Sequence, residues 1–488
     1  MKKDTLFSRV YEDLKMRIMN GQLPSGGIFP SIQTLREDYQ IGFRTARNVT
    51  RQLREEGFVK IYPRKAPIVN PLSPPLIEVD FAQEILAQKD SVLEVYKTIT
   101  HIIPPLLSFS SQGCNLKDLP HYTQALKIIH RGIKPDEWRV LFLLCQEIVQ
   151  FNGNPLATDL YASLTRFSCL SFFFKEQRTP ICALLSDAKH FITILELYDP
   201  HEKHRQLTVL CQRIFNAVKE CMEQLKEQYP EPLLSQKCIF QWNLFHGRNY
   251  CYTDIMLDLI PKITSGFYPP GSYLPHEAAL AKQYGVSIST LRKALSELRN
   301  LGYCKTLNAK GTIALKRDTN YAIKTVRNPA YRKEAILYLH AIQLMSLVIR
   351  DVARSSAPYF TQADVYNLTE KMKDPKANLL ESIIHIITLR SPLEPLRIII
   401  AETNRMISWS YYFSFYSNVE RSLQSLRYRG QKACQALINN ESEKFARELY
   451  IFYCQMFDAV RDYLANCCHL KEALTIRSPL DAKTIHTF

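Results

Sequence analysis

The sequence is poor in glycine. Only 15 of its 488 residues are glycine, about half of the share expected from an average usage of roughly 7%. A large α/β enzyme needs glycine for its phosphate-binding turns and its strand-to-helix corners. The shortage therefore favours a mainly helical protein and disfavours a nucleotide-binding enzyme.

Zinc-like cysteine spacing and long apolar runs are also absent from the sequence. The 13 cysteines form no CxxC pair and lie in apolar contexts, such as those of Cys145 and Cys169, which favours reduced, buried thiols in a cytosolic protein. No stretch reaches the roughly 18 uninterrupted apolar residues of a membrane helix, and the first residues contain no apolar signal core. We expect a soluble, cytoplasmic protein without a membrane segment.

The chain has an excess of positive charge. It contains 62 Lys and Arg against 47 Asp and Glu, a net charge of +15, and 46% of its residues are hydrophobic. A chain of this length and composition builds roughly three or more globular domains. The basic excess favours an anionic partner.

A repeat spans half of the chain. Residues 13–60 and 258–305 align without a gap at a constant offset of 245, with 15 identities in 48 positions. The identical pairs are Asp13/Asp258, Leu14/Leu259, Ile18/Ile263, Gly21/Gly266, Pro24/Pro269, Gly26/Gly271, Pro30/Pro275, Leu35/Leu280, Tyr39/Tyr284, Thr45/Thr290, Arg47/Arg292, Leu53/Leu298, Arg54/Arg299, Gly57/Gly302 and Lys60/Lys305. Because the offset is almost half of the length, we expect a tandem duplication in which each half has a small module followed by a larger one. The expected domains are 1–70, 71–245, 246–317 and 318–488.

The turn residues of the repeat predict a winged helix-turn-helix. A helix near 7–19 ends at Gly21, Ser31 caps a second helix through Tyr39, and a third helix over about 43–56 is closed by Gly57. Two β-like stretches, 58–62 and 67–69, follow around a basic tip. The second copy repeats this order, with a wing at 309–312.

One side of the third helix is basic and the opposite side is apolar when its residues are placed at intervals of about 100°. The basic side carries Arg44, Arg47, Arg51 and Arg54, and the apolar side carries Ala46, Val49 and Leu53. In the second copy Leu291, Ala294 and Leu298 are apolar, and Ser289, Arg292, Lys293, Ser296 and Arg299 populate the other side. Such a helix suits a major groove flanked by phosphates. A solvated charged face is the alternative, and the winged context favours DNA.

The net charge is concentrated in the two small modules. Residues 1–70 hold 13 Lys and Arg and 7 Asp and Glu, a net charge of +6, and residues 250–317 hold 9 and 4, a net charge of +5. These segments carry +11 of the +15 and therefore have the electrostatic character of a DNA contact.

The two modules resemble the DNA-binding domain of the GntR family of bacterial transcription regulators. The second copy follows the family pattern at Ile263, Gly266, Pro270, Gly271, Leu274, Pro275, Glu277, Leu280, Ala281, Gly285, Val286, Ser287, Thr290, Leu291, Arg292, Ala294, Leu295, Leu298, Gly302, Gly311 and Thr312. The first copy keeps Ile18, Gly21, Gly26, Pro30, Ser31, Leu35, Thr45, Arg47, Leu53 and Gly57, but has Ala66 at the wing glycine.

The resemblance implies DNA contacts from the start of the third helix and from the wing. The candidates are Arg44, Thr45, Arg47 and Lys65 in the first copy, with Arg51 on the same basic face, and Ser287, Ser289, Thr290, Arg292, Lys310 and Gly311 in the second. Phe43 and Ile288 stand where the family often has an arginine, and so do Gln33 and Ala278. We therefore expect an operator that differs from the commonest family pattern.

The two larger modules are predicted to be helical, so the fold class is mainly α. The segment 152–156, Asn-Gly-Asn-Pro-Leu, is similar to a step in the helical effector domain of the FadR branch of the family. The metal ligands of many such domains are missing, since Leu141 and Cys145 occupy two of the expected positions and only His190 could match a third. We expect no metal and no cofactor.

An organic, anionic effector is a candidate ligand of these helical modules. Arg166 and Arg405 occupy comparable positions in the two halves and are the candidate residues. A neighbouring carboxylate is the alternative partner of each arginine. The aromatic run Trp409, Tyr411, Tyr412, Phe413, Phe415 and Tyr416 is interpreted as helix packing or a subunit contact.

The leading hypothesis is a sequence-specific transcription regulator, not an enzyme, in which one chain supplies both winged modules of a conventional dimer and reads two unequal half-sites. The alternative is a protein-interaction or scaffold protein whose winged domains no longer read DNA specifically. A pyridoxal phosphate domain, found in some relatives, is disfavoured by the low glycine content. The sequence leaves open whether two chains associate further.

Overall fold

The computed structural model is mainly helical, which confirms the expected fold class. The residues that it describes are 6–19, 23, 26–39, 41–62, 66–70, 83, 85–133, 137–168, 188–229, 240–242, 251–264, 266–308, 310–316, 329–374, 379–408 and 420–479. The chain divides into two compact units, one of residues 1–247 with 393–398 and one of residues 248–392 with 399–488. The finer division into four domains stays a prediction.

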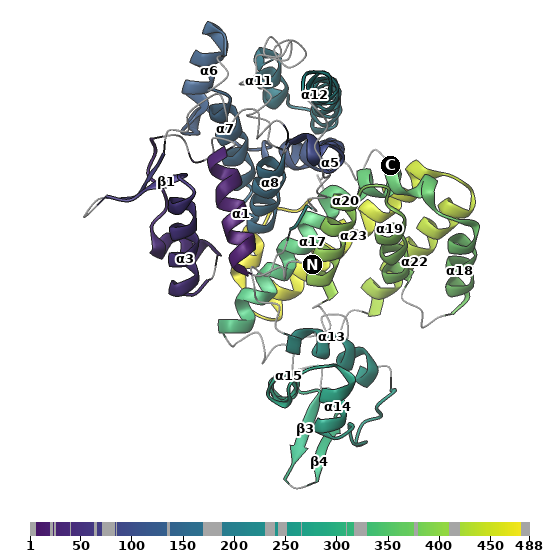
Figure 1. Ribbon diagram of the computed structural model, residues 1–488. Coiled ribbons are helices and arrows are strands. Elements are labelled where there is room, and N and C mark those ends of the chain that lie inside the picture. The colour runs from purple at the N-terminus through teal and green to yellow at the C-terminus, as the bar shows by residue number, and fades with distance from the viewer. Residues whose placement is uncertain are drawn as a thin grey trace. The chain divides into compact units, whose positions relative to one another are not determined.

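The first unit begins with three helices and a two-stranded antiparallel hairpin (Figure 1). These elements are α1 (Leu6–Met19), α2 (Ile32–Tyr39), α3 (Phe43–Glu55), β1 (Val59–Lys60) and β2 (Ile68–Val69). Ser31 Oγ accepts a hydrogen bond of 3.0 Å from the Thr34 N–H at the start of α2, as expected of a capping serine. Gly57 has φ +82° just beyond α3, a conformation that glycine adopts without a Cβ penalty.

The second unit begins with the same elements at the same offset. They are α13 (Cys251–Thr264), α14 (Glu277–Gln283), α15 (Ile288–Asn300), β3 (Cys304–Leu307) and β4 (Gly311–Ala314). The same two positions form an isolated β-bridge in each copy, Ile28 with Ile68 in the first and Tyr273 with Ile313 in the second. Positions 28 and 273 differ by 245, and so do positions 68 and 313. The duplication therefore extends without a gap through the hairpin, beyond the identities visible in the sequence.

The cores of the two winged domains also match position by position. Leu14, Leu35 and Leu53 are fully buried in one copy, as are Leu259, Leu280 and Leu298 in the other. Where the residue types differ, their volumes compensate. Buried Ala46 and Val49 on α3 correspond to buried Leu291 and Ala294 on α15, so that a large and a small side chain exchange places one helical turn apart.

The two hairpins differ in length. β3 and β4 pair over four positions, from Cys304↔Ala314 to Leu307↔Gly311. β1 and β2 pair over only two, Val59↔Val69 and Lys60↔Ile68. Gly311 closes the longer hairpin at φ +110°, where the first copy has Ala66.

Helices follow each winged domain in a matching order. The first set is α5 (Lys89–Ser110), η1 (Leu116–Asp118), α6 (Tyr122–Arg131), α7 (Trp138–Phe151), α8 (Pro155–Phe167), α11 (Ala188–Glu196) and α12 (Pro200–Gln228). The second set is α17 (Pro329–Ser356), η2 (Ala357–Tyr359), α18 (Gln362–Lys373), α19 (Leu379–Arg390), α20 (Glu394–Ser408), α22 (Glu420–Ile438), α23 (Ser442–Asn466) and η3 (Lys471–Thr475). The first long helix packs on the last long helix in each set, α5 on α12 and α17 on α23.

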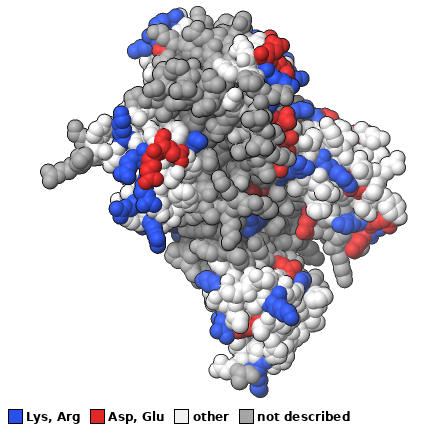
Figure 2. Space-filling view, in the orientation of Figure 1, with Lys and Arg blue, Asp and Glu red and all other residues white. Residues whose placement is uncertain are grey.

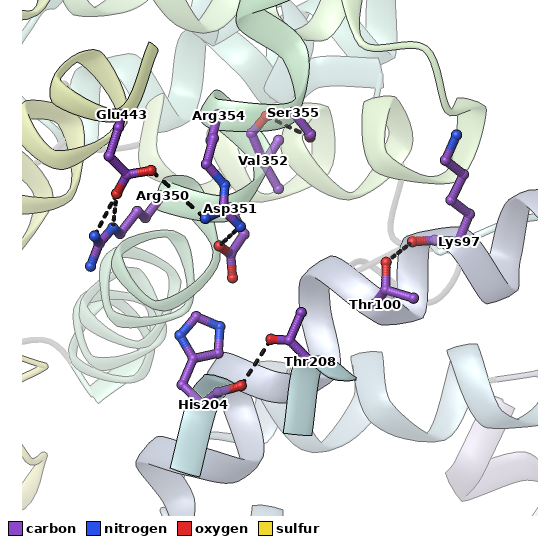
Figure 3. Close-up of polar contacts among 10 residues, drawn as sticks. All are labelled: Lys97, Thr100, His204, Thr208, Arg350, Asp351, Val352, Arg354, Ser355 and Glu443. Carbon is purple, nitrogen blue, oxygen red and sulfur yellow. Dashed lines mark hydrogen bonds and ion pairs between the residues drawn. The ribbon is translucent and has the colours of Figure 1, made fainter. Parts of the chain in front are cut away.

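Ion pairs reinforce both long-helix contacts. Lys89 Nζ on α5 lies 2.6 Å from Glu223 Oε1 on α12. On α17, Arg350 donates to Glu443 of α23 from Nε at 3.1 Å and from Nη2 at 2.5 Å, and Arg354 Nη1 lies 3.7 Å from the same carboxylate (Figure 3). Arg354 Nη2 also donates to Asp351 Oδ1 at 2.8 Å.

One described helix is long and apolar enough by averaged hydropathy to cross a membrane, although the sequence predicts no membrane segment. This helix is α17. Its most apolar stretch lies within Arg332–Tyr359, and 83% of that stretch is buried inside the protein. Its buried face includes the polar side chains of Gln343 and Ser346, both fully buried. Gln343 Nε2 donates to the Arg477 carbonyl at 2.7 Å. These features are typical of the central helix of a globular domain.

Candidate nucleic-acid interface

The third helix of the first winged domain exposes its arginines. Ala46, Val49, Thr50 and Leu53 form the buried face of α3. The predicted contact residues Arg44, Arg47 and Arg51 are exposed, together with Arg54, and Thr45 is half-buried. The division into a basic and an apolar face is therefore present in the folded domain.

Most of these arginines have no ion-pair partner among the described side chains. Arg51 Nε lies 3.9 Å from Glu55 Oε1, with both side chains more than half exposed, and a pair of this kind contributes little. Arg44, Arg47 and Arg54 make no ion pair with any described carboxylate. Their guanidinium groups are thus available to phosphates or base edges.

The corresponding helix of the second winged domain is more internally paired. Leu291, Ala294, Leu295 and Leu298 are the buried residues of α15. Arg292, the counterpart of Arg47, donates from Nε to Glu277 Oε2 of α14 at 2.7 Å. Lys293 Nζ lies 2.6 Å from Glu297 Oε1. Before Arg292 can contact DNA through the same atoms, its bond to Glu277 must be broken.

The sequence interpretation missed the role of Glu277. Ile32 occupies the equivalent position in the first copy and packs against the core, so Arg47 has no matching carboxylate there. Glu277 and Arg292 are 15 residues apart on different helices. The sequence signal that could have indicated this pair is the carboxylate Glu277 at a position where the first copy has the apolar Ile32.

The two recognition helices also begin differently. Ser287 caps α15, since its Oγ accepts from the Thr290 N–H at 3.2 Å and lies 2.8 Å from the hydroxyls of Ser289 and Thr290. Gly42 precedes α3 and provides no side-chain cap. The predicted contacts Ser287, Ser289 and Thr290 therefore form one hydroxyl cluster. In α3 no N-cap side chain accepts from the backbone N–H groups of the first turn, and Arg44 belongs to that turn.

The second wing is connected to its recognition helix. Arg299 Nη1 donates to Thr306 Oγ1 at 3.4 Å, and that hydroxyl lies 3.1 Å from Thr312 Oγ1 across the hairpin. Lys310 is exposed at the tip of the wing. Gly311 lies next to the ring of Tyr273, and a Cβ added at Gly311 would be 3.4 Å from that ring. Lys65, the candidate in the first wing, lies outside the described residues.

Polar contacts fix the first helix of each winged domain on its neighbour. Arg17 Nη1 donates to Tyr39 Oη at 3.1 Å. At the equivalent place Asp258 accepts from Lys262 Nζ at 2.6 Å and from Tyr284 Oη at 2.5 Å. Burial alone would raise the pKa of Asp258, but these two hydrogen bonds outweigh it and hold the pKa below the usual value. The contacts orient the helices that support α15.

Lys and Arg side chains gather on the winged domains. Figure 2 shows such side chains over the first winged domain, at the left of the view, with acidic side chains beside them, and others on the second winged domain, at the bottom. Each basic face is thus mixed with carboxylates, among them Glu55 in the first copy and Glu277 in the second.

The candidate effector residues have neighbours within their own helices. Arg166 on α8 donates to Ser163 Oγ at 3.0 Å. Arg405 on α20 has Nη1 4.0 Å from Glu402 Oε1. Arg405 thus has a carboxylate neighbour at long range, and Arg166 has a hydroxyl among its neighbours. The aromatic run 409–416 lies outside the described residues.

The positions considered for a metal do not form a ligand cluster. Leu141 and Cys145 are buried on α7, and burial raises the pKa of Cys145 to about 12. His190 is exposed on α11. Within the described ranges, no three His, Cys, Asp or Glu side chains group closely enough to hold a metal ion.

The geometry of residues 6–70 and 251–315 defines two winged helix-turn-helix domains. Residues 6–69 and 251–313 each match the family described as "Bacterial regulatory proteins, gntR family". The chain therefore carries the GntR-family domain twice, which confirms the resemblance seen in the sequence. Membership of the FadR branch stays a prediction.

Two curated proteins of Bacillus subtilis (strain 168) are similar to one such domain. The HTH-type transcriptional regulator TreR is 36% identical over 67 residues, which is 14% of this chain and 28% of TreR. The HTH-type transcriptional repressor NagR is 37% identical over 73 residues, which is 15% of this chain and 30% of NagR. The chain thus spans less than a third of the length of these relatives.

Solved structures give a more distant likeness. Streptococcus agalactiae GntR is 16% identical with a TM-score of 0.20, and the match covers 42% of this chain and 99% of that one. A GntR family member from Pseudomonas syringae pv. tomato str. DC3000 is 17% identical with a TM-score of 0.18, over 46% and 89% of the two chains.

Proposed function

We propose that the protein is a cytoplasmic, sequence-specific transcription regulator of the GntR type that binds double-stranded DNA through both winged domains of one chain. The observation that carries the proposal is the exposed basic face of α3, repeated in altered form on α15 at an offset of 245. A helix that packs by one face and presents Arg on the other suits the major groove.

The two domains would read unequal half-sites. An ordinary two-fold dimer presents the same helix to both half-sites and so requires a palindromic operator. In this chain the two helices differ, since α3 presents arginines without ion-pair partners among the described side chains whereas Arg292 on α15 is bound to Glu277. A fused pair of this kind needs no palindrome.

Control by a small organic anion is a further part of the proposal. Arg166 and Arg405 are the residues that such an effector would use, because they occupy comparable positions in the two halves and each is half-buried. Arginine binds carboxylates and phosphates in a planar, bidentate manner. Neither a second chain nor a membrane is needed for DNA binding.

Selection of binding sites from random DNA with the full chain tests the proposal. We expect one composite site with two different half-motifs, with Arg47→Ala degrading one half-motif and Arg292→Ala the other. Binding to the selected site should fall steeply with salt, because each phosphate contact releases counterions. Recovery of only symmetric sites would contradict the fused-pair reading.

A scaffold that no longer reads DNA is the second candidate. The shortened first hairpin, with two paired positions against four in the second, favours it for the first copy. This candidate predicts that selection yields no preferred sequence and that little DNA is bound even at low salt.

A further inference from the structure

A large apolar residue is exposed at the first position of each recognition helix. Phe43 begins α3 and is 55% exposed, and Ile288 begins α15 and is 45% exposed. The two positions are equivalent at the offset of 245. Isolated exposed apolar residues are common on protein surfaces, but here the same place is apolar in both copies while the residue type differs.

Both residues lie on the basic side of their helix. At about 100° per residue, Phe43 projects within about 20° of Arg54 and about 40° of Arg47. Ile288 has the same relation to Arg299 and Arg292. The nearest buried residues on the other flank, Ala46 and Leu291, project about 60° away from them. Phe43 and Ile288 therefore lie at the edge of the basic side, and their exposure assigns them to the face that would meet DNA and not to the core.

Base-edge chemistry limits what an apolar side chain can read in the major groove. Guanine, cytosine and adenine present hydrogen-bond donors or acceptors there, and thymine also presents a methyl group. A phenyl or sec-butyl group placed against a polar edge removes water from it without replacing the hydrogen bond. Against the methyl group, the same side chain buries apolar surface on both partners.

We propose that Phe43 and Ile288 are specificity residues, each reading the methyl group of one thymine in its own half-site. The inference rests on the proposed function, because it requires that both winged domains bind DNA in the major groove. It adds a base identity to each half-site.

The neighbours of the two residues make the expected half-sites different. Phe43 is followed by exposed Arg44, whereas Ile288 is flanked by the hydroxyl cluster of Ser287, Ser289 and Thr290. Arginine contacts guanine or phosphate, and hydroxyls contact several edges. The thymine read by Phe43 therefore has a more strongly specified neighbour than the thymine read by Ile288.

The test replaces single thymines of the selected operator by deoxyuridine, which removes only the methyl group. Binding of the full chain is measured by fluorescence anisotropy at fixed salt. One position in each half-site should weaken binding about fourfold, the effect of burying one methyl group. Replacing cytosine by 5-methylcytosine at the same two positions, in operators that carry cytosine there, should strengthen binding.

Variants assign each thymine to its residue. Phe43→Ala should abolish the deoxyuridine effect in one half-site only, and Ile288→Ala should abolish it in the other. Phe43→Leu should retain the effect, because an apolar side chain remains, and it keeps the test valid if the alanine variant fails to fold. Tyr366→Ala, which changes a 65% exposed aromatic residue outside the winged domains, should leave every deoxyuridine effect unchanged.

The outcomes separate the two proposals. Specific binding without a deoxyuridine effect in either half-site overturns the thymine assignment and leaves the regulator proposal standing. A deoxyuridine effect that persists in Phe43→Ala and Ile288→Ala also overturns it. Failure to select any sequence overturns both proposals together.

Discussion

The ion pair between Glu277 and Arg292 should weaken DNA binding by the second winged domain. Arg292 Nε lies 2.7 Å from Glu277 Oε2, and the two side chains are 67% and 39% exposed. A solvent-exposed pair contributes about 0–1 kcal/mol. Since about 1.4 kcal/mol corresponds to a factor of ten, Glu277→Gln should tighten operator binding by at most about fivefold.

Fluorescence anisotropy with the selected operator provides the assay. The gain in Glu277→Gln should shrink as salt is raised, because salt screens exposed charges. The loss caused by Arg292→Ala should be larger in the Glu277→Gln background than in the unmodified chain, because Arg292 then has no competing carboxylate. A double-mutant cycle gives this difference directly.

A matched control separates the ion pair from net charge. Glu55→Gln removes one negative charge from the other recognition helix, at a carboxylate 3.9 Å from Arg51. A gain in Glu277→Gln no larger than in Glu55→Gln would refute the competition argument. Weaker binding by Glu277→Gln would refute it more strongly, since it would mean that Glu277 itself contacts DNA.

Three predictions concern the fold. Burial alone would raise the pKa of Asp364, but hydrogen bonds, among them those from Arg390 at 2.8 and 3.2 Å, outweigh it and hold the pKa at about 2. The ionised carboxylate therefore contributes roughly 2 kcal/mol to the free energy of unfolding above the unfolded pKa of about 3.9, and this contribution is lost as the pH falls toward 2. Urea unfolding should show that Asp364→Asn is destabilised at pH 7 and that the difference from the unmodified chain shrinks toward pH 3. Asn154 accepts from two N–H groups at the start of α8, so Asn154→Ala should lower the free energy of unfolding by about 1 kcal/mol, and an unchanged midpoint would contradict the capping role. Ala46→Leu should overpack the first winged domain by about 1–3 kcal/mol, and adding Val49→Ala should restore part of the stability in thermal unfolding, because the second copy already holds this large and small pair in exchanged positions; no recovery would count against equivalent cores.

The helix boundaries of the winged domains were accessible from the sequence because local signals specify them. The expected third helix over 43–56 is found at Phe43–Glu55, and Gly57 ends it with a positive φ. Ser31 and Ser287 cap the helices that follow them. In these places the turn residue acts on its own neighbours, so no knowledge of the tertiary structure is required.

The contacts that distinguish the two copies were not accessible in the same way. The Glu277–Arg292 pair joins two helices across a turn, and its geometry depends on the packing angle between them. The lengths of the two hairpins, two paired positions against four, depend on how their strands pair and not on a local signal. Periodicity identified the exposed face of α3, but it could not show which arginines remain without an ion-pair partner.

The most direct test of the central claim is the stoichiometry of the complex with the selected operator, measured by native mass spectrometry and combined with footprinting of both half-sites. The account predicts one chain per duplex, with both half-sites protected and with Arg47→Ala and Arg292→Ala each exposing a different one. Two chains per duplex, or one chain that protects a single half-site, would contradict it.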